Sequence, residues 1–464
     1  MIGLINHIYE RSPIFMQNLF ISAYGRNLAR LRYGQTYKGT LSILKERNIS
    51  DASVQKDIQN RKFLDFLNYA LRFSPFYKDF YKDVDLSKVK TVDDIALLPV
   101  LDKETLRKNV EQVYSIEPKP YIYAHTGGTT GKSLVVKTQV EDGQERMAYL
   151  DWFKSLYGFT MCVDKHARFN GKSIIPNRQK AKIFWRDNRS INQRIYSSFY
   201  ASHDNLRYYV ENLNDYRPKE LDGFCSTIYD IAKYMIDNGI GPTYEPCAIF
   251  TTSETVMPHH REVIERAFGA KVRDQYASSE GAPFIIEMLD GYMHECIDTG
   301  VFEHIKTPQG TKLVVTSFTT HGCPLIRYDI GDNIIECDES DHPDTGIGFP
   351  AIKAIEGRKQ DFLYSEERGF VSAANLSNVI KNLPNSVINV QFVQHSINEI
   401  HVNLVVDKER FDKRRDQTVL LGEMYDRFGR DMYIRFNYLN SIERTKGGKY
   451  QTVINEVINH DDFE

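Results

Sequence analysis

The stretch YIYAHTGGTTGKSLVVKTQ, residues 121–139, decides the fold. Its centre contains only glycines, hydroxyl residues and one lysine: Thr126, Gly127, Gly128, Thr129, Thr130, Gly131, Lys132 and Ser133. Glycines let the backbone approach phosphate oxygens, and successive N–H groups of such a turn form a nest for an anion. The hydroxyl groups add donors, and the lysine adds a point charge. The composition predicts a phosphate-binding loop; the alternative is a hairpin rich in glycine and threonine that binds no ligand.

The sequence can be compared directly with one well-known phosphate-binding motif. A Walker A loop reads G-x-x-x-x-G-K-[ST]. Counting back from Gly131, Lys132 and Ser133, the first glycine should stand at position 126, where the chain has Thr126. A P-loop kinase is therefore disfavoured, although a phosphate-binding loop of another kind is not.

The order of apolar residues divides the chain into three parts. Residues 1–110 are expected to be mainly helical, because apolar residues recur at helical spacing near residues 63–71 and Pro75 ends that pattern. Residues 120–355 alternate strand-like and helical runs, which favours an α/β architecture. The tail has two strand-like runs near 387–406, a charged helical stretch over 409–428 and another strand-like run near 432–438. This order predicts a small α+β unit, with its boundary near Asp361.

Four further segments follow the glycine-rich loop: DQYASSEG (274–281), PLIRYDIGD (324–332), EGRKQD (356–361) and RTKGGKYQTVI (444–454). With the loop, they resemble the ordered motifs of the adenylate-forming superfamily of acyl-CoA ligases. Within it the chain is most similar to the phenylacetate–CoA ligase-like group, and there to the capsular-polysaccharide-biosynthesis branch. The opening MQNLFISAYGRNLARLRYG and the middle run FWRDNRSINQRIYSSFY extend this resemblance over nearly the whole chain.

The resemblance implies both a fold and an activity. It implies a large, multi-sheet α/β adenylation domain over residues 1–360 and a small mobile lid domain over 361–464. The implied enzyme is an ATP-dependent ligase that forms acyl-AMP, releases pyrophosphate and passes the acyl group to an acceptor. The acceptor is an amine or hydroxyl of a sugar precursor in surface-polysaccharide synthesis, or the thiol of coenzyme A. A non-catalytic nucleotide-binding protein of the same fold is the alternative.

The same resemblance implies roles for the nucleotide site. Loop residues 126–132 would hold the β- and γ-phosphates, and Glu280 would bind Mg²⁺. Tyr276 would lie against the adenine, in a pocket that Ala277 and Ser278 shape. For Glu280 the alternative is an acid at the N-terminus of a helix.

The remaining roles concern the ribose, the hinge and the lid. Asp332 would accept hydrogen bonds from the ribose hydroxyls, with Arg358 nearby; alternatively, Asp332 caps a turn after Gly331. Asp361 would be the hinge, and Arg358 with Asp361 could instead form a surface pair. Lys449 would reach the α-phosphate and carboxylate oxygens, where charge develops in the transition state; without the other motifs it would be a solvated turn lysine.

The carboxylic acid itself is not readable from the sequence. Ser226, within residues 223–228, and Ser253 resemble positions that flank the acyl pocket. Arg168, Asn170, Trp185 and Arg186 are candidate substrate contacts, and the two arginines would suit a second negative charge on the acid. Buried polar packing explains these four residues equally well.

Composition limits the other possibilities. The 464 residues allow about three domains at ~150 residues each. A formal net charge of −3 gives no overall electrostatic case for nucleic-acid binding. Six cysteines without a CxxC pair indicate reduced thiols and a cytoplasmic protein. No signal peptide is recognisable, and the apolar stretch at 14–23 is too short for stable membrane insertion.

Two smaller features complete the expectations. Arg26, Arg30 and Arg32 form a basic patch, which is either a solvated helix face or a weak contact with anionic lipid or a partner. For zinc, only His294, Cys296, Cys323, Cys337 and His342 are candidate ligands; without finger-like spacing, no structural zinc is expected. The adjacent His259 and His260 are expected on the surface.

Overall fold

The fold was analysed in a computed structural model of the chain. It describes residues 2–125, 135–172, 174–176, 179–201, 203–307, 310–337, 346–358, 362–366, 369–372, 376, 386–444 and 451–457. The predicted phosphate loop 126–132, the hinge residue Asp361, His342 and Lys449 lie outside these ranges, so their roles stay predictions.

The first part of the chain is helical: α1 (Ile2–Arg11), α2 (Ile14–Arg32), α3 (Gln35–Glu46), α4 (Ala52–Phe73), α5 (Pro75–Phe80) and α6 (Lys103–Val113). Helix α4 begins where the Asp51 side chain accepts hydrogen bonds from the N–H groups of Ser53 and Val54. It ends before Pro75, as the sequence predicts, and its buried residues include Phe63, Phe66, Leu67 and Ala70.

A mainly parallel sheet follows in the described chain, with the strand order β4-β5-β3-β6-β7-β8. Its strands are β3 (His166–Asn170), β4 (Trp185–Asn188), β5 (Gln193–Ser197), β6 (Glu220–Gly223), β7 (Ala248–Thr251) and β8 (Val272–Arg273). Only β4 runs antiparallel to its neighbour among these pairings. The associated helices are α7 (Val140–Ser155), α8 (Leu206–Tyr216), α9 (Cys225–Asp237) and α10 (Pro258–Phe268).

A second, antiparallel sheet has the order β12-β13-β14-β15-β11-β10-β9 within the described residues. Its strands are β9 (Gln275–Tyr276), β10 (Ile285–Glu287), β11 (Met293–Glu295), β12 (Gly300–Thr307), β13 (Gly310–Ser317), β14 (Leu325–Glu336) and β15 (Ala351–Arg358). Separately, β1 (Tyr121–His125) pairs in antiparallel fashion with β2 (Val135–Gln139). The predicted phosphate loop therefore lies in the sequence between two paired strands.

The tail has its own sheet, ordered β20-β19-β18-β21 in the part that the structure describes. It consists of β18 (Val387–Ser396), β19 (Glu399–Val406), β20 (Tyr433–Tyr438) and β21 (Val453–Asn455), with α12 (Lys413–Phe428) beside it. The hairpin of β16 (Phe362–Ser365) and β17 (Gly369–Ser372) precedes it. Helix α12 begins later than the expected residue 409, because Asp412 caps it by accepting from the N–H groups of Arg414 and Arg415.

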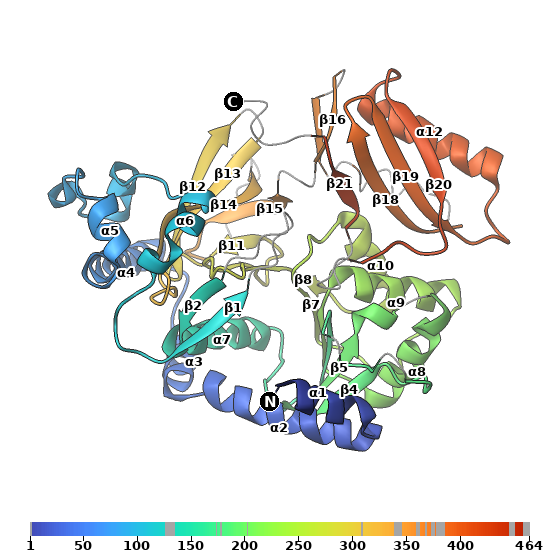
Figure 1. The fold of residues 1–464 in the computed structure, drawn as a ribbon, viewed down its shortest axis with the longest axis horizontal. Helices are drawn as coiled ribbons and strands as arrows, with labels where there is room; N and C mark the ends of the chain where they lie inside the picture. The colour runs from blue at the N-terminus through green and yellow to red at the C-terminus, as the bar shows by residue number, and fades with distance from the viewer. Residues whose placement is uncertain are drawn as a thin grey trace.

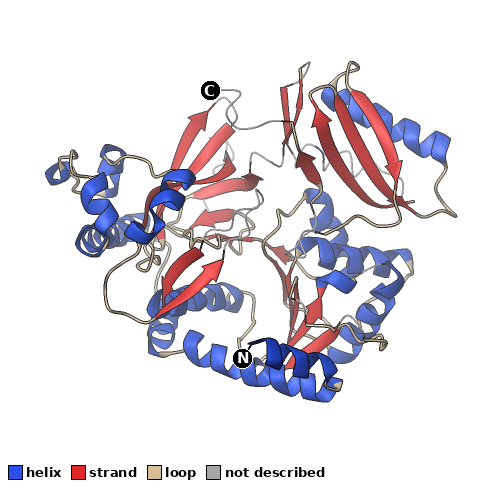
Figure 2. Cartoon of the chain, viewed as in Figure 1, coloured by secondary structure: helices blue, strands red, loops and turns tan. Residues whose placement is uncertain are grey.

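The apolar cores follow these divisions. One cluster joins the N-terminal helices to the antiparallel sheet, another fills the space between the parallel sheet and α8–α10, and a third belongs to the tail. Figure 1 shows the tail as a body of its own beside the rest, and Figure 2 shows helices mainly around the outside of the sheets. The predicted fold class, a multi-sheet α/β domain with a small C-terminal α+β domain, is confirmed; the exact division at 360/361 stays a prediction.

Candidate active site

Two of the predicted nucleotide-binding residues are in direct contact. The Tyr276 hydroxyl donates a hydrogen bond of 2.7 Å to Asp332 Oδ2. Tyr276 ends β9 and Asp332 lies within β14, so motifs 56 residues apart meet at one place in the antiparallel sheet. Asp332 is buried and lies in a strand, which excludes the alternative that it merely caps a turn after Gly331. The neighbouring β15 places the backbone of Arg358 opposite Asp332.

Glu280 lies in a tight turn after β9. Its carboxylate is buried, with 3% of the side chain exposed, and forms an ion pair of 3.3 Å with Lys103 at the start of α6. The turn is held by Arg146, which donates to the carbonyl oxygens of Gly281 and Ala282. No helix begins here in the described chain, so the alternative of an acid at a helix N-terminus is wrong. Ser278 stabilises the same turn by accepting from the Ala282 N–H at 3.1 Å.

One of the two strands that flank the predicted phosphate loop, β2, belongs to the same apolar core as the turn. Val136, in β2, packs in the same buried cluster as Ala282, and Tyr276 packs against that cluster. The hydroxyl of Tyr114 donates to the Val135 carbonyl at 2.7 Å, which fixes the first described residue after the loop. Strand β2, which follows the loop in the sequence, thus packs in the same cluster as Tyr276 and Ala282.

The predicted acyl-pocket residues lie at the ends of parallel strands. Ser226, in the first turn of α9, donates its N–H to Glu254 at 2.8 Å, and its hydroxyl donates to the other carboxylate oxygen at 3.0 Å. Ser253 adopts φ 68°, a left-handed conformation that is uncommon for a residue with a side chain and is often found at functional sites. Gly223 lies at the end of β6, where an added Cβ would stand 2.0 Å from the Phe169 carbonyl oxygen.

The segment that precedes Lys449 reaches this pocket wall from the C-terminal domain. Arg444 donates to Ser226 Oγ and to Asp230 Oδ2, each at 3.2 Å. Beyond Lys449, the backbone carbonyl of Gln451 accepts a hydrogen bond from Gln391 at 2.8 Å. Both described ends of the stretch that carries Lys449 are therefore fixed, one against α9 and the other against β18.

Asp230 is the acidic partner in this contact, and 14% of its side chain is exposed. Burial raises the pKa of Asp230 to about 7, while Arg444 lowers it and Glu254 raises it further. Asn389 of β18 also hydrogen-bonds to this carboxyl group. Arg444 and Asn389 both come from the C-terminal domain, so Asp230 binds that domain through two side chains.

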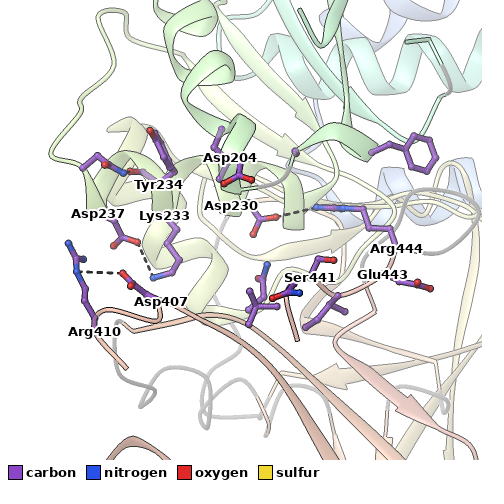
Figure 3. A pocket seen from close by; sticks show the side chains of 18 residues that line it. Asp204, Asp230, Lys233, Tyr234, Asp237, Asp407, Arg410, Ser441, Glu443 and Arg444 are labelled. Carbon is purple, nitrogen blue, oxygen red and sulfur yellow. Dashed lines mark hydrogen bonds and ion pairs between the residues drawn. The ribbon is translucent and has the colours of Figure 1, made fainter. Parts of the chain in front are cut away.

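A cavity of about 750 Å³ lies beside this contact, between α8–α9 and the C-terminal domain. Figure 3 shows three ion pairs around it: Asp230 with Arg444, Lys233 with Asp237, and Asp407 with Arg410. Only the first of these three joins the two domains. Sequence reasoning missed Asp230, because a single aspartate on an amphipathic helix gives no signal until its distant partners are known.

The predicted substrate arginines have partners within the protein. Arg186 is fully buried and donates to Gln17, Gln179 and backbone carbonyls, so the packing interpretation is correct for it and a direct substrate contact is wrong. Arg168 forms an ion pair with Asp222, which Lys154 also binds. The Asn170 side chain accepts the Lys172 N–H at 3.1 Å. For Arg168 and Asn170 a substrate contact stays a prediction.

The expectation of a surface histidine pair is wrong. His259 and His260 are both buried, and their rings lie 4.1 Å apart. Burial lowers the pKa of His260, and its Nδ1 contacts Cys225 Sγ at 3.5 Å. Of the zinc candidates, His294 instead contacts Phe349 O and Asp290. Within the described ranges, no group of three or more His, Cys, Asp or Glu side chains could hold a metal ion.

Comparisons with known proteins agree with the layout of the chain. The profile of the CapK C-terminal domain matches residues 363–456. Protein CapK of Staphylococcus aureus is 40% identical over 457 residues, which cover 98% of this chain and 100% of that protein.

Solved structures of 2-hydroxyisobutyryl-CoA ligase share the fold. The postadenylation state of that enzyme, in complex with R3-HIB-AMP, has a TM-score of 0.68 at 16% identity, covering 87% of this chain and 90% of the other. Its thioesterification state, with 2-HIB-AMP and CoA, has a TM-score of 0.52 at 17% identity, covering 88% and 90%. The fold is therefore that of the adenylate-forming ligases.

Proposed function

The chain belongs to the CapK family, and on this premise we propose that it is an ATP-dependent ligase that activates a carboxylic acid as acyl-AMP. An oxygen of the carboxylate attacks the α-phosphorus, the bond to the β-phosphate breaks, and pyrophosphate leaves. A nucleophile then attacks the acyl carbonyl carbon, and AMP leaves.

The observation that carries this proposal is the hydrogen bond from Tyr276 to Asp332. Two residues expected on opposite parts of one nucleoside are in contact, although they belong to different motifs and strands. The tight turn after Tyr276 brings Glu280 close to the same place. In this arrangement Tyr276 would pack on the adenine, and Asp332 would bind the ribose hydroxyls with Arg358 beside it.

Glu280 is suited to hold Mg²⁺. Magnesium in phosphate sites is bound by one or two carboxylates together with waters and substrate phosphates, so a single buried carboxylate fits it. The metal would offset the negative charge of the triphosphate when two anions are brought together. In the structure the same carboxylate pairs with Lys103 at 3.3 Å.

Loop residues 126–132 would bind the β- and γ-phosphates, and Lys449 would contact the α-phosphate and the carboxylate. The position of Arg444 supports this second role, because Arg444 precedes Lys449 by five residues in the sequence and donates to Ser226. Ser226 and Ser253 would face the acid.

The proposal also includes the acceptor of the acyl group. CapK similarity favours an amine or hydroxyl of a sugar precursor in capsular-polysaccharide synthesis, in the cytoplasm. The thiol of coenzyme A is the second candidate, because the structural neighbour in its thioesterification state binds CoA.

The test is ATP–pyrophosphate exchange with a panel of carboxylic acids. We expect exchange that depends on one class of acid and on Mg²⁺, and a loss of about 10²- to 10³-fold in Lys449→Ala and in Glu280→Gln. ATP binding without acid-dependent exchange would instead favour a non-catalytic nucleotide-binding protein. AMP release with and without CoA, once the acid is known, separates the two acceptors.

A further inference from the structure

Helix α2 has an unusual distribution of side chains. A surface helix normally turns its apolar side chains inward and its polar ones to water. In α2 the buried face carries polar groups: Arg186 donates to Gln17 at 2.7 Å, the Asp187 N–H donates to Asn18 at 3.0 Å, and the Arg189 N–H donates to Ser22 at 3.0 Å. The polar residues of α2 therefore attach the helix to β4.

The outward face carries the exposed apolar residues, whereas Ile14, Ile21 and Leu28 are half-buried. Phe15, Leu19 and Tyr24 are 66%, 58% and 63% exposed, and Met16 and Phe20 are also exposed. At 100° per residue these five side chains fall within one half of the helix surface. Together they form an exposed apolar patch of a kind that marks an interaction site.

The same outward half of α2 carries arginines in the last two turns of the helix. Arg26 and Arg30 are exposed and follow Phe15 and Leu19 along one stripe of the helix. Helix α2 contains no aspartate or glutamate, and no ion pair is recorded for these two arginines with any described residue. Figure 1 shows α2 at the lower edge of the molecule.

We propose that this face of α2 docks on an anionic phospholipid surface. Apolar and aromatic side chains with unpaired arginines on one helix face are the chemistry of a helix that lies in the plane of a membrane interface. None of the described helices is long and apolar enough to cross a membrane, so the contact is peripheral.

A second copy of the chain fits this face less well. A two-fold interface would bring two copies of this face together, and α2 offers no acidic side chain that could pair with Arg26 and Arg30 of the other copy. Like charges at an interface oppose association. An anionic lipid surface instead complements both the arginines and the apolar patch.

The test is binding of the intact chain to vesicles of phosphatidylcholine with phosphatidylglycerol, compared with vesicles of phosphatidylcholine alone. We expect binding only to the anionic vesicles, and weaker binding as salt screens the arginines. Arg26→Ala/Arg30→Ala should weaken binding about 30-fold, since each arginine near an anionic surface contributes about fivefold. Phe15→Ser/Leu19→Ser should weaken it by more than about tenfold, because both side chains leave water on docking.

The matched control is Ile43→Ser/Arg414→Ala, which removes an apolar residue that is 67% exposed and an exposed arginine elsewhere on the molecule. It should bind like the parent chain, and thermal unfolding should be unchanged in all variants, because the substituted side chains are exposed. The proposal is overturned if the parent chain does not bind anionic vesicles, or if the control loses as much binding as the α2 variants. A dimer in sedimentation that Phe15→Ser/Leu19→Ser dissociates would assign the face to a second copy. Vesicle binding needs no ligase activity, so the result is independent of the proposed function.

Discussion

Tyr276 and Asp332 act as a pair at the scale of single residues. The phenol holds the carboxylate at 2.7 Å, so the acid is oriented before any nucleoside binds. A hydrogen bond to a charged group contributes about 1.5–3 kcal/mol. Asp332→Ala should therefore raise the KM for ATP about 10- to 100-fold in pyrophosphate exchange, and Tyr276→Phe should raise it less.

The control for this prediction is Asp329→Asn, three residues earlier in β14. Asp329 pairs with Lys312 at 2.5 Å and contacts neither Tyr276 nor Glu280 in any recorded bond. An equal rise of KM in Asp329→Asn would show that the effect comes from a damaged sheet and not from a lost ribose contact.

Single residues also show where sequence reasoning succeeds and fails. Tyr276, Asp332 and Glu280 could be found because each stands in a short motif whose spacing survives in the chain. Arg186 could not be interpreted, because its partner Gln17 lies 169 residues away and only the folded chain brings them together. The burial of His260 could not be predicted for the same reason, since its ring contacts Cys225 in a different helix.

At the scale of elements, the junction of β8 and β9 contains a buried acid. Burial raises the pKa of Asp274 to about 7, and Glu287 raises it further while Arg261 lowers it. Its side chain accepts hydrogen bonds from the Gln275 N–H at 2.8 Å and the Thr251 hydroxyl at 3.3 Å. Asp274 thus lies directly before β9, the strand that ends in Tyr276.

This position makes stability depend on pH. The folded chain binds a proton at Asp274 that the unfolded chain has lost above about pH 4, so the free energy of unfolding should fall as the pH rises from about 4 to about 7. The slope from this group is at most about 1.4 kcal/mol per pH unit. Urea unfolding should show a smaller slope over that range in Asp274→Asn. An unchanged slope would mean that Asp274 is already ionised at low pH in the folded chain.

The helices and strands were predicted well where the apolar pattern is regular. Their first and last residues were predicted less well. The strand pattern of 399–406 and the helix that stops at Pro75 both follow from residues next to one another in sequence. Helix α2 shows the limit: its apolar side chains suggest a core face, yet the structure turns them outward because Gln17, Asn18 and Ser22 bind β4.

At the scale of the whole molecule, Arg444 connects two domains. It binds Asp230 and Ser226 on α9, and 13% of its side chain is exposed. Arg444 precedes the predicted catalytic Lys449 by five residues in the sequence. On the proposed function, we expect its contact with Asp230 to support the formation of the acyl-adenylate.

Arg444→Ala should then reduce pyrophosphate exchange at least about tenfold, because removing one partner leaves a buried carboxylate uncompensated. Transfer of the acyl group from added acyl-AMP should fall much less, because the mobile lid that the resemblance implies would take another position in that step. The control is Arg410→Ala, which removes an ion pair within the C-terminal domain beside the same cavity. Equal losses in both half-reactions, or in Arg410→Ala, would contradict this role.

On the proposed function, Gly223 limits how a protein engineer could change the acid that this chain accepts. Its φ of 148° and the nearby Phe169 carbonyl leave no room for even a methyl group at the end of β6. A library that randomises this position would return unfolded clones, not new specificities. Redesign has to begin at Ser226 or Ser253, where the structure already accommodates a side chain.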